Sequence, residues 1–182
     1  MKRFHRTAGK LIAFAALLAS VPTLADTRAE IDAGVNAALE QFYAQSAANR
    51  ELVAKASAVL VFPRVTKGGA GVAASYGEGA LVEHGRTMGY YKMTAGSIGA
   101  TIGVGQRREV VLFMTDAARD TFVTSKGWTI GADTGVALVS KGAGGEYDSE
   151  TLRKPILAFV FGEKGLIADA SIEGTKVTKI RA

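Results

Sequence analysis

The hydrophobic pattern of the segment Ala58–Leu81 predicts strands interrupted by glycine. Its first part, Val59–Phe62, is a run of β-branched and aromatic residues that is typical of a strand buried on both faces. We expect Pro63 to end this strand, because proline has no N–H for the ladder, and Lys67-Gly68-Gly69 to form a turn. Three more glycines lie in the apolar stretch that follows: Gly71, Gly77 and Gly79. Glycine within a strand marks a bulge, a bend or a close backbone approach, so the pattern predicts a strongly curved sheet.

The residues before this segment have the apolar spacing of helices. A first helix is predicted by apolar residues that recur every three or four positions, namely Ile31, Val35, Leu39 and Phe42. Thr27 and Glu30 have the spacing of a capping box, and Asn49 is predicted to cap a shorter second helix. The polar face of the first helix is mainly acidic, which is the wrong sign for an anionic membrane, so we expect this helix to cover the sheet.

Beyond residue 64 the chain reads as consecutive antiparallel strands. Of the 21 glycines after residue 25, 17 fall between residues 64 and 145, where they separate short apolar segments. Glu83–Arg86 is predicted to be a turn, and Thr115 to cap a short helix that stops at Gly127. A second turn is predicted at Glu163-Lys164-Gly165. The predicted strands are residues 80–82, 88–93, 110–114, 128–139 and 156–161, with two further extended pieces ending near Ile180.

The first 25 residues have the pattern of a secretory signal. Four basic residues, Lys2, Arg3, Arg6 and Lys10, precede or open an apolar run at 11–18, and small residues near Ala25 offer a cleavage site before Asp26. The run is shorter than the roughly 20 residues of a membrane span. We therefore predict cleavage near Ala25 and a single domain at 26–182, located in the periplasm or secreted. Cleavage lowers the formal net charge from +5 to +1, which removes the compositional argument for a nucleic-acid partner.

Composition and pattern together predict an α+β fold. The chain is 48% hydrophobic and has no cysteine, so burial rather than disulfides must hold it together. The architecture we expect is a strongly curved antiparallel sheet or partial barrel, flanked by N-terminal helices and one short interior helix.

The residues available for catalysis are few. His84 is the one histidine after residue 25, and it lies beside glycine in a predicted turn. Ser97, His84 and Asp133 could be assembled into a hydrolytic triad, but no serine has the surroundings of a nucleophile elbow. We therefore expect no enzymatic activity, with a hydrolase kept as a third alternative.

Metal and cofactor sites have equally weak signals. Two carboxylate pairs are close in sequence: Asp116 with Asp120, and Asp148 with Glu150, where a weak calcium contact is conceivable. The stretch Gly99–Gly105 lacks the order of a dinucleotide-binding loop, and no Walker motif is present. No metal and no cofactor is expected.

Several motifs, in one order, resemble the SYLF domain family. They are VFPRVTKGG at Val61–Gly69, YGEG at Tyr76–Gly79, GSIGATIG at Gly96–Gly103, VVLFMT at Val110–Thr115, GAD at Gly131–Asp133, EKGL at Glu163–Leu166 and SIEG at Ser171–Gly174. Ala70 and Thr101 depart from the family, where an aromatic residue and glutamine are common.

This resemblance implies a noncatalytic domain that associates with phospholipid, with phosphoinositide headgroups and actin as eukaryotic partners. For an exported bacterial protein, we therefore expect binding of anionic phospholipid at the cell envelope. Among the basic residues, the candidates for contact with phosphate are Lys67, Arg107, Arg108 and Lys141. The alternative is a structural or protein-interaction module of the envelope.

Overall fold

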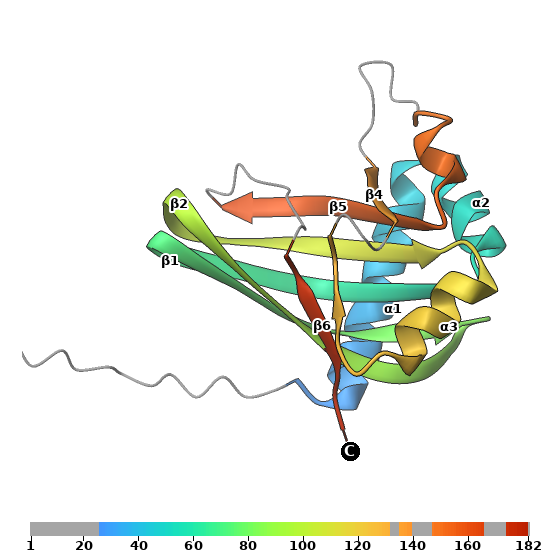
Figure 1. Cartoon of the computed structure of the whole chain (residues 1–182), viewed down its shortest axis with the longest axis horizontal. Helices are drawn as coiled ribbons and strands as arrows, with labels where there is room; N and C mark the ends of the chain where they lie inside the picture. The colour runs from blue at the N-terminus through green and yellow to red at the C-terminus, as the bar shows by residue number, and fades with distance from the viewer. Residues whose placement is uncertain (1–25, 132–134, 140–146, 166–173, 182) are drawn as a thin grey trace, which may run out of the picture.

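The computed structural model describes residues 26–131, 135–139, 147–165 and 174–181. Within them the helices are α1 (Arg28–Gln45), α2 (Ala47–Lys55), α3 (Asp116–Thr124) and the 3-10 turn η2 (Thr151–Arg153). The strands are β1 (Ala58–Glu83), β2 (Arg86–Phe113), β3 (Trp128–Thr129), β4 (Val136–Val139), β5 (Ile156–Gly165) and β6 (Lys176–Lys179). The α+β class with a strongly curved sheet is confirmed (Figure 1).

Two very long strands dominate the sheet. β1 has 26 residues and β2 has 28, and they pair antiparallel from Ala58↔Phe113 to Glu83↔Arg86. The predicted turn is confirmed as a two-residue hairpin loop, in which His84 has φ 48° and Gly85 has φ 77°. Positive φ at both positions is the geometry of a tight hairpin turn. β2 also pairs with β5 and β6, so it is the strand to which most of the sheet is attached.

The β1–β2 ribbon folds back on itself, and glycines allow the two halves to touch. A Cβ at Gly69 would overlap the Val72 carbonyl oxygen, and a Cβ at Gly79 would overlap that of Val61. At Gly77 a Cβ would lie 2.8 Å from the Arg64 carbonyl oxygen. The predicted link between glycine, close backbone approach and curvature is therefore confirmed at Gly77 and Gly79, whose neighbours lie in the other half of β1. The contact at Gly69 is local, because Val72 lies only three residues further along β1.

Two predicted turns and one predicted strand end are wrong. β1 runs through Pro63 and through Lys67–Gly69, and β5 runs through Glu163–Gly165. The register shifts between Phe62 and Val65, so Pro63 lies in a bulge, where a missing N–H breaks no regular ladder bond. One strand pair departs from the expected antiparallel arrangement, because β4 pairs parallel with β5.

The helices were predicted more accurately than the strand ends. Thr27 and Glu30 form the predicted capping box of α1, and Thr115 caps α3. α3 ends at Thr124, before the predicted stop at Gly127. Asn49 does not cap α2; Ser46 does, and Asn49 is fully buried, donating to the Phe42 carbonyl oxygen and accepting from the Tyr147 hydroxyl.

Two hydrophobic clusters lie on the two faces of the sheet. The α1-side cluster packs Ile31, Val35 and Phe42 against alternate residues of β1, β2 and β5, which confirms that α1 covers the sheet. The α3-side cluster holds Phe122 of α3 against Tyr91, Phe113 and Trp128. None of the described helices is long and apolar enough to cross a bilayer.

Candidate functional site

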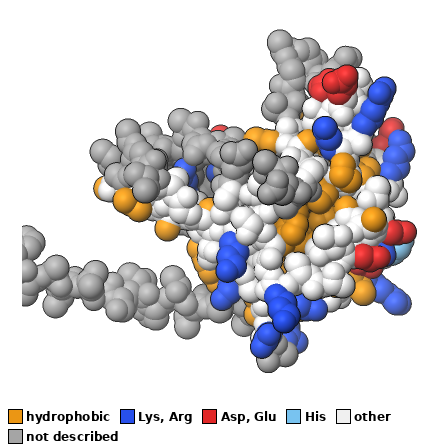
Figure 2. All heavy atoms as spheres, viewed as in Figure 1, with side chains coloured by type: hydrophobic (Ala, Val, Ile, Leu, Met, Phe, Trp, Pro, Cys, Tyr) orange, Lys and Arg blue, Asp and Glu red, His pale blue; other side chains and the backbone are white. Residues whose placement is uncertain are grey.

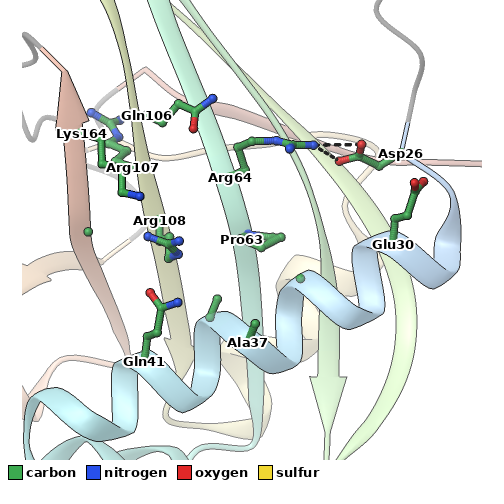
Figure 3. Close-up of a pocket in the computed structure, with 13 residues that line it drawn as sticks. Asp26, Glu30, Ala37, Gln41, Pro63, Arg64, Gln106, Arg107, Arg108 and Lys164 are labelled. Carbon is green, nitrogen blue, oxygen red and sulfur yellow. Dashed lines mark hydrogen bonds and ion pairs between the residues drawn. The ribbon is translucent and has the colours of Figure 1, made fainter.

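A cleft of about 450 Å³ lies between α1 and the neighbouring strands (Figure 3). Four basic residues line it: Arg64 from β1, Arg107 and Arg108 from β2, and Lys164 from β5. Asp26 and Glu30 line the same cleft from the start of α1. We call this feature the cationic cleft, because four positive side chains face two negative ones.

Small residues on α1 bring the helix close to the strands beside the cleft. Gly34, Ala37 and Ala38 line it from the helix, and a Cβ at Gly34 would lie 3.0 Å from Cγ of Pro63. A larger side chain at this position would push α1 away from β1, since contacts this short force a neighbour to move. The width of the cleft is therefore set by the helix sequence.

Arg108 is positioned by a local irregularity between β2 and β5. The register of these strands shifts between Gln106 and Arg108, and opposite the shift Gly162 has φ 65°. A Cβ on Gly162 would lie 2.5 Å from Nη1 of Arg108, so the glycine makes the space that the guanidinium occupies. Among the residues that the structure describes, neither Arg108 nor Lys164 has an ion-pair partner.

Arg107 is held differently from Arg108, because its side chain is 2% exposed and forms an ion pair with Glu109. The Nη2 and Nε atoms of Arg107 both lie 2.8 Å from Oε1 of Glu109, which is also 2% exposed. Burial raises the pKa of Glu109 above its usual value, and the adjacent Arg107 charge acts in the opposite direction. The charge of Arg107 is thus largely compensated by Glu109 within the fold.

The other two predicted phosphate contacts are not among the described residues that line the cleft. Lys67 is 5% exposed and is absent from the lining of the cationic cleft, and Lys141 is outside the described residues. The structure thus brings two of the four predicted residues, Arg107 and Arg108, to one cleft. It adds Arg64 and Lys164, which lie far apart in sequence and were not in the predicted set; only their basic character hinted at a role.

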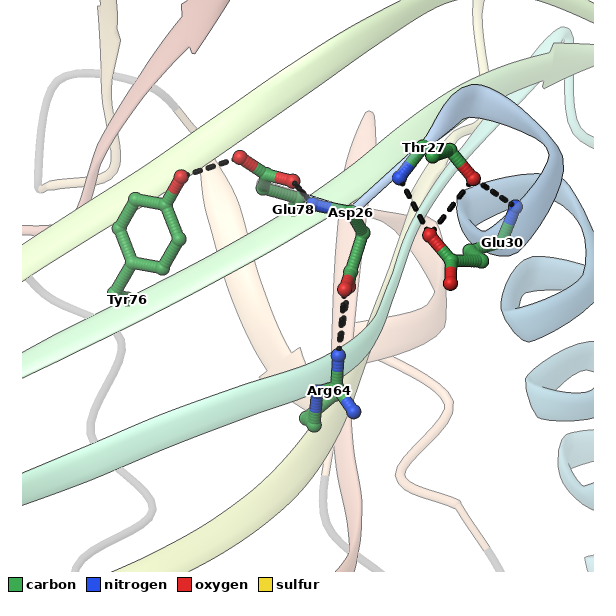
Figure 4. A network of polar contacts seen from close by, with 6 residues as sticks. All are labelled: Asp26, Thr27, Glu30, Arg64, Tyr76 and Glu78. Carbon is green, nitrogen blue, oxygen red and sulfur yellow. Dashed lines mark hydrogen bonds and ion pairs between the residues drawn. The ribbon is translucent and has the colours of Figure 1, made fainter. Parts of the chain in front are cut away.

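A polar network joins the start of α1 to β1 at one edge of the cleft (Figure 4). The Arg64 guanidinium binds both carboxylate oxygens of Asp26, at 2.7 and 2.9 Å. Glu78 accepts from the Asp26 backbone N–H at 3.0 Å and from the Tyr76 hydroxyl at 2.5 Å. Partial burial, followed by the hydrogen bond to Glu78, raises the pKa of Tyr76 to about 12.

The residues considered for catalysis lie at different points of the chain, and two of the three are described. His84 lies in the β1–β2 turn, Ser97 lies within β2, and Asp133 is outside the described residues. Asp116 and Asp120 both bind Arg119, and Asp148 accepts from the backbone and side chain of Thr151. Those hydrogen bonds lower the pKa of Asp148. The described residues contain no group of three or more potential metal ligands.

Comparison with known proteins identifies the C-terminal half of the chain. Residues 94–181 match the model of the Ysc84 family, described as "Las17-binding protein actin regulator", which is the SYLF domain. The predicted resemblance is therefore confirmed over this range, which includes β2 from residue 94 onward, β5, β6 and the cleft residues Arg107, Arg108 and Lys164.

A curated relative supports the same assignment. Beta cell expansion factor A of Aeromonas veronii is 34% identical over 90 residues, which cover 48% of this chain and 32% of the relative. The match thus spans about a third of that protein, and its remaining length has no counterpart in the alignment.

Proposed function

We propose that the protein is a noncatalytic module that binds anionic phospholipid at the bacterial cell envelope, because residues 94–181 match the model of the SYLF family. Membership of the family supports a lipid-binding or actin-associated module. Envelope location rests on the N-terminal pattern of basic residues followed by an apolar run, with cleavage before Asp26.

The observation that carries the proposal is the cationic cleft. Arg108 and Lys164 are its two basic residues without an ion-pair partner among the described residues. A guanidinium binds phosphate with two parallel N–H donors, and an ammonium adds a point charge. A phosphodiester entering between α1 and β5 would meet both side chains, while Gln41 and Gln106 offer neutral polar contacts.

Arg107 and Lys67 have a supporting role in this proposal. Arg107 lines the cleft but is paired with Glu109, and Lys67 is nearly buried within the curved sheet. Fixed cations in a poorly solvated region still add to the positive potential of a nearby cleft. We expect the direct phosphate contacts to come from Arg108 and Lys164, and to a smaller extent from Arg64.

The bend of the β1–β2 ribbon is apolar, and we expect it to contact the acyl region of the lipid. Val72 and Val104 are 65% and 67% exposed, and they lie close to the bend of the β1–β2 ribbon at Gly69. In Figure 2 hydrophobic side chains are also visible at the far left end of the molecule, which is the bend of the ribbon in Figure 1. No acidic residue occurs between Pro63 and Gly77 or between Met93 and Arg108, so these two stretches of the ribbon carry no charge that an anionic surface would repel.

Vesicle flotation tests the proposal. The processed protein should float with vesicles of anionic phospholipid at low salt and not with zwitterionic vesicles, and R108Q/K164Q should lose most of the association. Each cation near an anionic surface contributes on the order of 1 kcal/mol, so two of them predict a reduction of roughly tenfold to thirtyfold. R153Q/K154Q removes the same charge at exposed positions outside the cleft and serves as the control. Equal flotation with both vesicle types would contradict the proposal.

The second candidate is a protein-interaction module of the envelope. It is favoured by the description of the matched family, which refers to binding of a protein and to regulation of actin. Affinity capture from envelope extracts that recovers one stoichiometric protein, while vesicle flotation stays flat, would support this function over lipid binding.

A further inference from the structure

The backbone nitrogen of Asp26 is held by a nearly buried carboxylate. It lies 3.0 Å from Oε2 of Glu78, which is 9% exposed and which also accepts from the Tyr76 hydroxyl. The Asp26 side chain is fixed separately, through both of its oxygens, by Arg64. Two side chains of β1, Glu78 and Arg64, therefore hold the residue that precedes the α1 cap, and Tyr76 supports Glu78 from its other oxygen (Figure 4).

The position of this contact coincides with the proposed cleavage site. Hydrolysis of the Ala25–Asp26 peptide bond by a signal peptidase consumes one water molecule. It leaves a carboxylate on Ala25 and an amino group on Asp26, which is protonated at neutral pH to an ammonium. After cleavage, the nitrogen opposite Glu78 thus carries a positive charge and three N–H donors instead of one.

We propose that Glu78, supported by Tyr76 and Arg64, is a binding site for the N-terminal ammonium group that processing creates on Asp26. This inference depends on the export processing included in the proposed function, and it is independent of lipid binding. In the uncut chain Glu78 accepts from two neutral donors, the Asp26 backbone N–H and the Tyr76 hydroxyl, and the ammonium group would replace the first of them.

The charge on Glu78 supports this assignment. Among the described residues Glu78 has no ion-pair partner, although its side chain is more than nine-tenths buried. A buried carboxylate that meets only neutral donors costs free energy, and a cation at hydrogen-bond distance removes much of that cost. The Asp26 ammonium would be that cation, at a position the backbone already occupies.

The surrounding groups favour a positive charge at this point. The N-terminal end of a helix disfavours a cation, and α1 begins two residues later. Against this, the carboxylates of Asp26, Glu30 and Glu78 all lie at the same end of α1, with one guanidinium, that of Arg64, opposite them (Figure 4). Three negative charges therefore face one positive charge before cleavage, and cleavage adds a second positive charge on Asp26.

The consequence concerns the cationic cleft, because Asp26 and Glu30 line it. An anchored N-terminus keeps the first residue against β1 and holds the edge of the cleft in one arrangement. Processing also adds one positive charge at that edge. We therefore expect the edge of the cleft to be held more firmly in the processed chain than in the precursor.

The first test is the N-terminal residue of protein purified from the cell envelope, determined by sequencing and intact mass. Asp26 is expected, and a first residue at any other position would overturn the inference. This measurement does not depend on lipid, so it also separates failure of processing from failure of phospholipid binding.

The second test measures how much the free ammonium group stabilises the folded protein, by urea denaturation of three forms of the chain. One begins at Asp26, one begins at Asp26 with an acetylated amino group, and one retains Ala25. Acetylation keeps an N–H donor but removes the charge, and charge-assisted hydrogen bonds are about twice as strong as neutral ones. We expect the folding equilibrium constant to fall about fivefold on acetylation and by at least as much when Ala25 is retained.

Variants then assign the effect to Glu78. In E78Q the three forms should differ by less than twofold, because the amide has no charge for the ammonium to meet. E51Q changes an exposed glutamate of α2 and should keep the fivefold effect. If E78Q does not fold, the acetylation effect in the unsubstituted chain still decides the question. No difference between free and acetylated Asp26, or the same difference in E78Q, would overturn the inference.

Discussion

At the scale of single residues, Arg107 and Glu109 form the one ion pair among the described residues in which both side chains are buried. Both side chains are 2% exposed, so each charge depends on the other for compensation. R107M should lower the free energy of unfolding by about 3–5 kcal/mol at neutral pH, because Glu109 would be left buried and unpaired. Urea denaturation at pH 7 measures this loss.

The pH dependence of R107M follows from the direction of the Glu109 shift. Burial raises the folded-state pKa of Glu109, so protonation stabilises the folded protein at low pH, and this contribution is lost as pH rises through the folded-state pKa. Removing Arg107 removes the charge that opposes the shift, so R107M should recover part of its stability between pH 7 and pH 5. The double variant R107M/E109Q is the control and should show little of this recovery. A loss in R107M that does not change with pH would contradict the argument.

Residue types were easier to predict than residue environments. Arg107 and Arg108 were predicted as phosphate contacts from their basic character, and the structure places both at one cleft. The sequence does not indicate that the Arg107 side chain is buried. Lys67 was expected in an exposed turn, and it is nearly buried because β1 continues through that position. Asn49 has the side chain of a helix cap, yet it is buried between Phe42 and Tyr147, which no local pattern indicates.

At the scale of elements, the folded β1–β2 ribbon depends on glycines that have no space for a side chain. A Cβ on Gly79 would overlap the Val61 carbonyl oxygen and would lie 2.8 Å from Cδ1 of Phe62. G79A should therefore lower the free energy of unfolding by about 1–3 kcal/mol or more, since the backbone of the facing half must move. G96A is the matched control in the same ribbon, because nothing lies within 4 Å of a Cβ at Gly96. Equal stability of G79A and G96A in thermal denaturation would show that the two halves do not need this approach.

The predicted strand ends were wrong where glycine or proline was taken to end a strand. The strands continue through Pro63, Lys67–Gly69 and Glu163–Gly165. Bulges near these positions accommodate the missing N–H donor of proline and the bending of the strands. Helices α1 and α3 were predictable, since their caps and apolar spacing are local signals. The two long strands were predicted only as separate short pieces, because pairing over that distance depends on the partner strand, which a local window does not contain.

At the scale of the whole molecule, one sheet supports two hydrophobic clusters. The sheet alternates its side chains, so that Val110 and Leu112 join the α1-side cluster while Val111 and Phe113 join the α3-side cluster. The predicted α+β class and curvature follow from this alternation and from the glycines. The parallel β4–β5 pair was not predictable, because no local pattern indicates which strand lies beside β4.

A shared sheet implies that the two clusters unfold together. F42A on the α1 side and F122A on the α3 side each remove a ring that is at most 1% exposed, which should cost about 3–5 kcal/mol. Trp128 is the single tryptophan and contacts Phe122 at a centroid distance of 5.3 Å, so its fluorescence reports on the α3 side. Because β1 and β2 belong to both clusters, F42A should shift the Trp128 transition as much as the transition seen by far-UV circular dichroism. V123A, at a residue 40% exposed on α3, is the control and should shift both transitions only slightly. If F42A instead moved the circular dichroism transition and left the Trp128 transition in place, the two faces would be separate folding units, and strands common to both could not be what holds the domain together.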